Sequence, residues 1–249
     1  MNNLCEVFFM LKAVFFDLDG TLLPLDEDQF VKVYFGKLSE KMANYGYNKE
    51  KLIDCIWAGT KLMYQNDGKK DNFEVFWEYF ESIYGNEKLD DIKIFDEFYY
   101  NEFKETKKVC KDNPYARIII DECKKLNLET YLTTNPIFPL HGTQTRMGFV
   151  DLKLDDFTLV TSYENSRFTK PNPEYFKEIL ELSGLNSDEV ILFGNNTYED
   201  GECSLACGIK CYLVGDYIIN HPKSTNTFEH IKMEDVIPTI IKEMKLREN

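Results

Sequence analysis

The sequence lacks the long apolar runs and the leader pattern that would direct a chain into or across a membrane. None of its 249 residues belongs to a stretch approaching the roughly 18 consecutive apolar residues that a membrane-spanning helix needs. The opening residues MNNLCEVFFM carry no basic region of the kind that starts a signal peptide, so no signal peptide is expected. Because LKAVFF directly follows Met10, translation could also begin there, which would make residues 1–9 a loose extension.

Positive charge and paired cysteines are also scarce. The chain has 29 Lys and Arg residues against 43 Asp and Glu residues, which gives a formal net charge of −14. A field of that sign repels nucleic-acid backbones and anionic lipids, so we expect no nucleic-acid or membrane partner. The seven cysteines form no C-x-x-C pair, which is typical of free thiols in a reducing compartment and predicts a cytoplasmic protein.

Apolar and aromatic residues are plentiful, at 43% and 14%, and they suffice for a globular core. Five short apolar runs predict strands at 12–16, 128–133, 157–161, 190–193 and 210–214. Amphipathic helical patterns at about 136–148, 173–183 and 198–207 separate the later runs. This alternation predicts an α/β fold with a Rossmann-like, doubly wound parallel sheet.

Residues 24–112, between the first two predicted strands, show helical patterning only. A connection of about 90 residues is far longer than an ordinary βα loop. We therefore predict an all-helical cap domain at 24–112, inserted into a core formed by 1–23 and 113–249. Apolar stripes at helical spacing predict its own small core, and they consist of Leu52, Ile56 and Met63, then Phe73, Phe76, Trp77 and Phe80, then Phe95, Phe98, Tyr99 and Phe103.

Polar segments follow four of the predicted strands. They are Asp17 with Asp19, Thr134 with Asn135, Lys170, and the stretch GNNTYED at 194–200. In parallel α/β sheets, ligands bind outside the carboxyl ends of the strands. These four segments, although far apart in the sequence, are therefore expected to meet at one site.

The residue types at these strand ends suit phosphoryl transfer. Asp17 and Asp19 can point the same way from extended backbone, and Gly20 lets the chain turn away. One carboxylate can attack phosphorus while the other moves protons, and a hard cation such as Mg²⁺ must offset their repulsion of the phosphate. Thr134 can donate a hydrogen bond to the phosphoryl group, and Lys170 supplies fixed positive charge.

Each segment also has a plainer explanation. The sequence D-x-D-G could be an ordinary turn after a strand, Thr134 and Asn135 could open the next helix, and Lys170 could be solvated. The occurrence of all of them in this order, each at a strand end, favours the phosphoryl-transfer interpretation.

Four motifs in this order resemble those of the haloacid dehalogenase-like (HAD) hydrolases: Asp17–Leu22, Thr134–Asn135, Lys170–Pro173 and Gly194–Asp200. The resemblance covers about residues 11–215 and implies a Rossmann-like core with a helical cap inserted after the first motif. It implies a Mg²⁺-dependent phosphatase acting on a small phosphorylated metabolite. Asp17 would be the nucleophile and a metal ligand, Asp19 the general acid/base with its carbonyl on the metal, and Gly20, Thr134, Asn135 and Lys170 would bind phosphate.

The fourth motif departs from the phosphatase pattern, because Asn195 and Asn196 stand where an aspartate is usual. Asn195 is then the expected amide ligand of the metal, with Asn196 as the alternative, and Asp200 either binds or orients the metal or caps a helix through the Thr197–Asp200 spacing. The amides motivate a second hypothesis, a catalytically weak phosphate-binding or regulatory protein. A third hypothesis, 2-haloacid dehalogenation, is disfavoured by the presence of Asp19, which the dehalogenating branch lacks.

The remaining expectations concern the helical segment and assembly. In the cap, the stretch with Trp57 beside Gly59 and Thr60 is the best candidate to face the site. His141 and Arg146 could approach a substrate anion, although a place on a helix surface is the simpler expectation for both. The sequence gives no clear interface, so a monomer or a homodimer is expected.

Overall fold

The computed structural model describes residues 10–247, so the expectations for residues 1–9, including Cys5, lie outside the described part. Its centre is a six-stranded sheet with the strand order β3-β2-β1-β4-β5-β6, in which every neighbouring pair is parallel. The strands are β1 Ala13–Phe16, β2 Glu129–Leu132, β3 Leu159–Val160, β4 Val190–Gly194, β5 Lys210–Val214 and β6 Glu229–Ile231. The predicted doubly wound α/β fold is confirmed.

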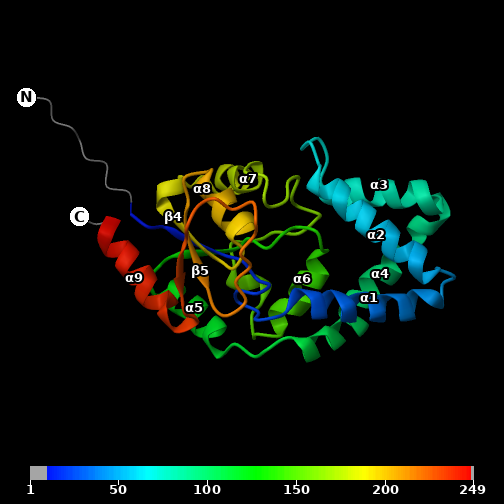
Figure 1. The fold of residues 1–249 in the computed structure, drawn as a ribbon, viewed down its shortest axis with the longest axis horizontal. Coiled ribbons are helices and arrows are strands. Elements are labelled where there is room, and N and C mark those ends of the chain that lie inside the picture. Colours follow the sequence, from blue (N-terminus) through cyan, green and yellow to red (C-terminus); the bar gives the residue numbers. More distant parts are fainter. Residues whose placement is uncertain (1–9, 248–249) are drawn as a thin grey trace, which may run out of the picture.

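Helices cover both faces of this sheet (Figure 1). The strands carry apolar side chains on both faces, and the helices bury them. In β1, Val14 and Phe16 join one apolar cluster, whereas Phe15, between them, joins the other. The first face is covered by α5 (Pro114–Lys125), α6 (Leu140–Gly148) and α9 (Val236–Arg247), and the second by α7 (Glu174–Ser183) and α8 (Cys203–Leu205). The central strand β1 is thus buried on both faces, and its carboxyl end is paired with both β2 and β4.

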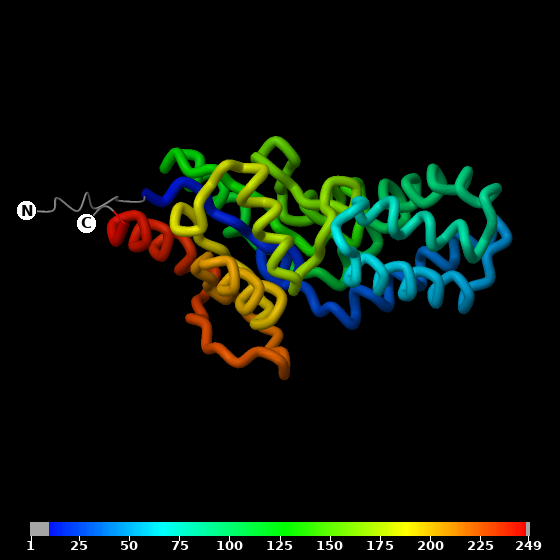
Figure 2. Tube along the Cα trace, turned by 90° about the horizontal axis from the view of Figure 1, so that it is seen from above, coloured from blue at the N-terminus to red at the C-terminus, as the bar shows by residue number. Residues whose placement is uncertain are grey.

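Every element between Glu27 and Val109 is helical. This segment extends away from the sheet on the side opposite to α9, the red helix at the end of the described chain (Figure 2). The chain leaves and re-enters the sheet region side by side, since Leu25 and Cys110 form an antiparallel bridge and Lys111 N donates to Pro24 O over 2.8 Å. The elements are α1 Glu27–Ala43, α2 Lys49–Tyr64, α3 Asn72–Tyr84, η1 Asn86–Asp91, α4 Ile92–Tyr100 and η2 Glu102–Val109.

The apolar core of this helical segment continues into the core beneath the sheet. The ring of Phe138, in the loop before α6, lies within 5.5 Å of the Tyr34 ring and 6.1 Å of the Phe103 ring, centroid to centroid. The predicted aromatic stripes pack inside this shared cluster. The division into a separate cap at 24–112 therefore stays a prediction, because no gap in the packing marks a boundary.

Two predicted helices differ from the observed ones. The helix expected at 136–148 begins only at Leu140, because Pro136 and Pro139 keep the preceding backbone extended or turned. The helix expected at 198–207 divides into a π-helical turn, η5 (Thr197–Glu202), and the short α8. Within residues 10–247, no helix combines the length and the apolar character that a membrane crossing requires.

Candidate active site

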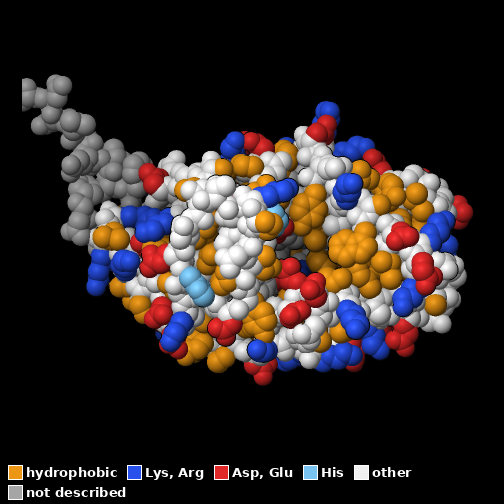
Figure 3. Space-filling view, in the orientation of Figure 1, with side chains coloured by type: hydrophobic (Ala, Val, Ile, Leu, Met, Phe, Trp, Pro, Cys, Tyr) orange, Lys and Arg blue, Asp and Glu red, His pale blue; other side chains and the backbone are white. Residues whose placement is uncertain are grey.

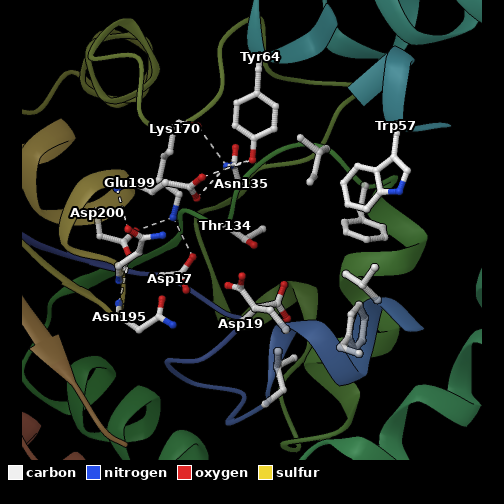
Figure 4. Close-up of a pocket in the computed structure, with 17 residues that line it drawn as sticks. Asp17, Asp19, Trp57, Tyr64, Thr134, Asn135, Lys170, Asn195, Glu199 and Asp200 are labelled. Atoms are coloured by element: carbon white, nitrogen blue, oxygen red, sulfur yellow. Dashed lines mark hydrogen bonds and ion pairs between the residues drawn. The ribbon is translucent and has the colours of Figure 1, made fainter. Parts of the chain in front are cut away.

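A cavity of about 250 Å³ opens where β1, β2 and β4 end and α1 and α2 of the helical segment face them (Figure 4). Core residues form its inner end, and residues of the helical segment form most of its outer wall. The lining residues are Asp17, Asp19, Leu25, Glu27, Phe30, Val31, Trp57, Tyr64, Thr134, Asn135, Ile137, Phe138, Lys170, Asn195, Asn196, Glu199 and Asp200. All four sequence motifs contribute to it, as the sequence predicts.

Lys170 joins the first motif to the fourth. Its side chain is 2% exposed, and Nζ donates to Asp17 Oδ1 over 2.8 Å and to Asp200 Oδ1 over 2.6 Å. The other Asp17 oxygen, Oδ2, accepts from Thr21 Oγ1 over 3.1 Å. The explanation of Lys170 as a solvated residue is therefore wrong, because its buried ammonium bridges the carboxylates of the first and fourth motifs.

The electrostatics of this triad follow from its burial. The pKa of Asp17 is raised to about 7. Burial is the largest cause and the nearby Asp200 carboxylate adds to it, whereas the Lys170 ammonium lowers the pKa and offsets part of the rise. Burial alone would lower the pKa of Lys170, but the Asp17 and Asp200 carboxylates outweigh that effect and raise the pKa well above its usual value of 10.5. Lys170 is thus charged at every working pH.

Asp19 is paired with Arg146, a residue of α6. Arg146 Nη1 donates to Asp19 Oδ2, Arg146 Nη2 donates to Thr143 Oγ1 over 3.2 Å, and the guanidinium lies 4.5 Å above the Phe138 ring. Burial raises the pKa of Asp19, and Arg146 opposes that rise. A carboxyl group with a raised pKa suits an exchange of protons with a leaving group and with water.

Arg146 is 1% exposed, so the expectation of a helix-surface position is wrong for this residue. Its side chain reaches Asp19 from α6, and Gly142 O, one turn earlier in the same helix, accepts from Arg146 Nε over 3.3 Å. His141, on the same helix, is half-buried against Tyr100, 4.4 Å between ring centroids, and is not a lining residue of the cavity. The predicted position on a helix surface therefore holds for His141, which is partly exposed, but not for Arg146.

The two residues of the second motif, Thr134 and Asn135, have different positions and partners in the site. Thr134 is buried and lines the cavity, while its carbonyl accepts from Tyr175 OH over 2.9 Å, which fixes the strand end. Asn135 Nδ2 donates to Glu199 Oε2 over 3.0 Å and to Tyr64 OH over 3.0 Å, so it is occupied in joining the core to α2. Asn135 Oδ1 is buried and has no partner among the described residues.

Gly20, expected to bind phosphate, is not among the lining residues. It has a φ of +79°, a conformation that favours glycine, and it turns the chain away after Asp19. A Cβ atom at this position would collide with the side chain of Asn195. The contacts of Gly20 therefore explain a turn and a close approach, and its phosphate-binding role stays a prediction.

The fourth motif folds around Asp200. Asp200 Oδ2 accepts from the backbone N–H groups of Asn195 and Asn196 over 3.0 and 2.9 Å, in addition to the Lys170 bond of Oδ1. Asn196 Oδ1 caps η5 by accepting from the N–H groups of Tyr198 and Glu199. The N-cap is Asn196, so the alternative of a capping box from Thr197 to Asp200 is wrong, although Asp200 accepts from the backbone N–H of the cap residue itself. Both Asp200 oxygens are occupied by protein donors, and this geometry supports an orienting role.

The side chain of Asn195 is buried, with Nδ2 donating to Tyr217 O over 2.9 Å. This bond leaves Oδ1 as the amide atom able to face a cation. Of the two amides, Asn195 is therefore the better candidate ligand, because the oxygen of Asn196 already caps η5.

The residues at the inner end fit a hard cation by their chemistry. Carboxylate, amide and main-chain carbonyl oxygens are the donors that Mg²⁺ takes in proteins. Asp19 Oδ1 is buried without a partner in the described structure, so oxygen lone pairs are unused here. Between Met10 and Arg247, no group of three or more His, Cys, Asp or Glu side chains could hold a metal alone. Amide and main-chain oxygens would have to complete such a site.

Three polar lining residues were not identified from the sequence as part of the site. Glu27 follows the strand–turn of the first motif at the start of α1, Tyr64 ends α2, and Glu199 lies within the fourth motif. Tyr64 OH also donates to Glu199 Oε1 over 3.4 Å. Trp57, singled out in the sequence, does line the cavity, whereas Gly59 is explained by packing, since a Cβ there would collide with the Phe76 ring.

Comparison with known proteins identifies the type of chain. A family model described as "Haloacid dehalogenase-like hydrolase" matches residues 14–214. A search of curated proteins finds no match.

Solved structures with the same fold cover nearly the whole chain at low identity. A HAD phosphatase from Thermococcus onnurineus is 16% identical with a TM-score of 0.57, over 92% of this chain and 97% of its own. A predicted phosphoglycolate phosphatase from Haemophilus somnus 129pt is 15% identical with a TM-score of 0.54, over 92% and 97%. A 2-haloacid dehalogenase from Pseudomonas syringae pv. Tomato DC3000 is 16% identical with a TM-score of 0.60, over 94% and 99%. At these identities the likeness shows the fold alone.

Proposed function

The chain belongs to the haloacid dehalogenase-like hydrolases, and from that premise we propose that it is a Mg²⁺-dependent phosphatase that hydrolyses phosphomonoesters of small metabolites. The observation that carries the proposal is the buried Lys170, whose Nζ lies 2.8 Å from Asp17 Oδ1 beside a second acid, Asp19. A nucleophilic carboxylate, a proton-transfer group and a fixed cation are the parts that phosphoryl transfer requires.

The proposed reaction has two steps. A carboxylate oxygen of Asp17 attacks phosphorus, the bond from phosphorus to the ester oxygen breaks, and the carboxyl group of Asp19 gives its proton to the leaving alcohol. Asp19, now ionised, then takes a proton from a water molecule that attacks the same phosphorus. That attack breaks the acyl-phosphate bond, frees inorganic phosphate and restores both carboxyl groups.

Other residues hold the reacting groups in place. Lys170 keeps Asp17 oriented and offers positive charge to the transferring group, and Asp200 fixes Lys170 from the opposite side. Thr134 is placed to donate its hydroxyl to a phosphoryl oxygen. The carboxylate of Asp17, the carbonyl of Asp19 and the amide oxygen of Asn195 would hold Mg²⁺, which offsets the negative charge of the phosphate and the acids when bound.

Two other functions use the same fold. Dehalogenation is opposed by Asp19, a group that this reaction does not require. A catalytically weak phosphate-binding protein is favoured by one observation, the uncharged amides at 195 and 196. Mg²⁺ binding tighter than about 1 mM, together with turnover of many substrate molecules per protein, would exclude the binding protein.

The first prediction is that phosphate release depends on Mg²⁺ and on Asp17. A panel of phosphomonoesters is incubated with Mg²⁺ or with a chelator, and the released inorganic phosphate is measured. We expect turnover with Mg²⁺, near-complete loss with the chelator, and loss of at least about a thousandfold in Asp17→Asn, because an amide cannot form the acyl phosphate.

Asp28→Asn is the matched control for this test, since Asp28 is exposed on α1 and does not line the cavity. It should keep the activity of the parent protein. Equal turnover by Asp17→Asn and the parent would contradict the mechanism, and metal-independent halide release from a 2-haloacid would indicate the dehalogenase instead.

A further inference from the structure

The outer part of the cavity has a chemistry that phosphate hydrolysis itself does not require. The side chains there are of two kinds, apolar and acidic. The apolar ones are Leu25, Phe30, Val31, Trp57, Ile137 and Phe138. The acidic ones are Glu27, from the first turn of α1, and Glu199, from η5. Figure 3 shows apolar side chains gathered over the helical segment on one face of the molecule, with acidic side chains beside them.

Trp57 is the most unusual of the apolar residues. Its side chain is 51% exposed, although the other tryptophan, Trp77, is buried. One edge of its indole packs on the Phe35 ring, 5.4 Å between centroids, and Figure 4 shows the indole facing the cavity. A large aromatic ring left open at the mouth of a cavity is suited to cover another ring, because flat apolar surfaces gain by stacking and by leaving water.

The cavity also lacks a cation for a second anionic group. Among its lining residues, all of them within the described part of the chain, Lys170 is the sole basic residue, and Asp17 and Asp200 already bind it. Glu27 is exposed at the cavity wall, but desolvation by its neighbours first, and then the charges of Asp19 and Glu199, raise its pKa to about 7. This mutual effect of the carboxylates reflects an excess of negative charge at the outer wall.

We propose that the substrate is a monophosphate ester of a ring-bearing alcohol whose leaving part carries no second anion; this rests on the phosphatase function proposed above. The phosphate lies at Lys170 and the paired acids, and the ring lies against Trp57 and its apolar neighbours. A carboxylate or a second phosphate on the leaving part would face Glu27 and Glu199 without a counter-charge, and like charges brought together in this way strongly disfavour binding. Sugar bisphosphates and phosphorylated hydroxy acids are therefore expected to be poor substrates.

Three matched esters test the proposal: benzyl phosphate, para-carboxybenzyl phosphate and para-aminomethylbenzyl phosphate. Their leaving alcohols have similar reactivity, so differences in kcat/KM report on recognition. Assays are run above the Glu27 pKa of about 7, where its carboxylate is ionised. We expect the carboxylate ester to be hydrolysed less efficiently than benzyl phosphate by on the order of tenfold or more, and the amine ester at least as well. Equal or better hydrolysis of the carboxylate ester would overturn the proposal.

A charge reversal at the wall makes the test specific. Glu27→Lys should narrow the gap between benzyl and carboxybenzyl phosphate by about fivefold or more, because it provides the missing counter-charge. Glu50→Lys is the control, since Glu50 has the same first-turn position in α2 and is exposed like Glu27, but does not line the cavity. If the ratio of kcat/KM for the two esters were unchanged in Glu27→Lys, or changed equally in Glu27→Lys and Glu50→Lys, the proposal that Glu27 faces the leaving group would be overturned.

The ring contact has its own variant. Trp57→Ala should raise KM for benzyl phosphate by about fivefold or more and leave KM for methyl phosphate, which has no ring, unchanged. Trp57→Phe should restore most of the affinity for benzyl phosphate. Equal effects of Trp57→Ala on both esters would show that Trp57 does not contact the leaving group.

Binding separates this inference from the phosphatase proposal. The three benzyl esters are also titrated with Mg²⁺ while Trp57 fluorescence is followed, and Trp57→Phe shows which part of the signal comes from that residue. Selective binding without turnover would overturn the phosphatase proposal and keep the inferred ligand class. Turnover without selectivity would overturn the ligand class and keep the phosphatase, and no binding of any ester would overturn both.

Discussion

At the scale of single residues, Asn195 is the position where this chain departs most from a strongly charged metal site. Asn195→Asp would add a carboxylate facing the paired acids, while it would lose the bond that Nδ2 donates to Tyr217 O. We expect the variant to lose about 1 kcal/mol of unfolding free energy without Mg²⁺, and to bind Mg²⁺ about tenfold more tightly than the parent. Calorimetric titration and thermal unfolding with and without Mg²⁺ measure both effects.

Asn196→Asp is the matched control for this prediction. An aspartate at 196 can still cap η5, since Asp and Asn are both good caps, and its oxygen stays occupied by the N–H groups of Tyr198 and Glu199. Its Mg²⁺ affinity should remain close to that of the parent. If Asn196→Asp tightened Mg²⁺ binding and Asn195→Asp did not, the assignment of the metal-facing amide would be reversed.

Arg146 is predicted to act through Asp19, as a positioning residue. Arg146→Lys keeps the charge but cannot bind Asp19 and Thr143 through separate nitrogens of one rigid group. We expect kcat to fall by about tenfold or more with KM changed by less than about twofold, because the proton-transfer group is displaced while substrate contacts remain. His141→Ala, on the same helix outside the cavity, should leave both constants unchanged. A rise in KM with an unchanged kcat would instead indicate a substrate-binding role for Arg146.

The sequence predicts part of this residue-level arrangement, for a clear reason. Asp17, Thr134 and Lys170 directly follow strands or their connecting loops, so the topology alone brings them together. Arg146 lies inside α6, where an arginine is ordinarily solvated, and only the packing of α6 under the site shows that its side chain reaches Asp19. Long side chains that cross between elements leave no periodic signal in the sequence.

At the scale of elements, one contact ties helix α2 to the loops of the core. Tyr64, the last residue of α2, accepts from Asn135 Nδ2 and donates to Glu199 Oε1. Tyr64→Phe removes both bonds, while Asn135 and Glu199 remain paired with each other over 3.0 Å. We expect a loss of about 1 kcal/mol or less in unfolding free energy, and faster amide hydrogen exchange at the end of α2, which covers the cavity.

Tyr45→Phe is the control for the Tyr64 prediction, because Tyr45 is also exposed on the helical segment but does not line the cavity. It should leave the exchange of α2 unchanged. Unchanged exchange in Tyr64→Phe would show that apolar packing alone holds α2 over the site.

The elements themselves were predictable where the pattern is local and strong. Strand β5 matches its predicted range of 210–214, and the helix predicted at 173–183 is observed as α7, Glu174–Ser183. Strand β6 was missed because it has three residues, none of them buried, and therefore no apolar run. The π-helical turn η5 was also missed, because its geometry depends on Asp200 binding the N–H groups of Asn195 and Asn196, a contact that periodicity does not encode.

At the scale of the whole molecule, stability should depend on pH through Asp156. Arg117 Nη2 and Lys124 Nζ, both on α5, lie 2.6 Å from its two carboxylate oxygens. Burial would raise the pKa of Asp156, but the hydrogen bonds from Arg117 and Lys124 outweigh it and lower the pKa from 3.8 to about 2. Because the folded state has the lower pKa, this contribution to stability is fully present above pH 3.8 and is lost as pH falls toward 2.

Asp156→Asn should therefore lose about 2 kcal/mol of unfolding free energy at neutral pH. The difference from the parent should shrink steadily as the pH falls from about 4 to about 2, which urea unfolding at several pH values measures. Asp155→Asn, one residue earlier, is the control and should change little, because Asp155 is exposed and forms no ion pair among the described residues. A difference between Asp156→Asn and the parent that stays constant with pH would contradict the role of the charge.

The overall architecture was predictable because strand alternation, the order of the motifs and the long helical interval all point to one topology. The sequence did not predict that the helical segment and the sheet share one apolar core, which depends on Phe138 packing against Tyr34 and Phe103. It also did not predict the acidic and apolar outer wall of the cavity. That wall combines residues from α1, α2 and η5, and their juxtaposition is set only by the packing of the helices over the sheet.

The central claim is that Asp17 carries the phosphoryl group during turnover. The most direct measurement is to quench the protein with acid while it hydrolyses a phosphomonoester in the presence of Mg²⁺, and to map the phosphoryl adduct by peptide mass spectrometry. We predict an adduct on the peptide that contains Asp17. This adduct should depend on substrate and Mg²⁺ and should be absent from Asp17→Asn. Sustained turnover by Asp17→Asn, or an adduct found only on another residue, would contradict it.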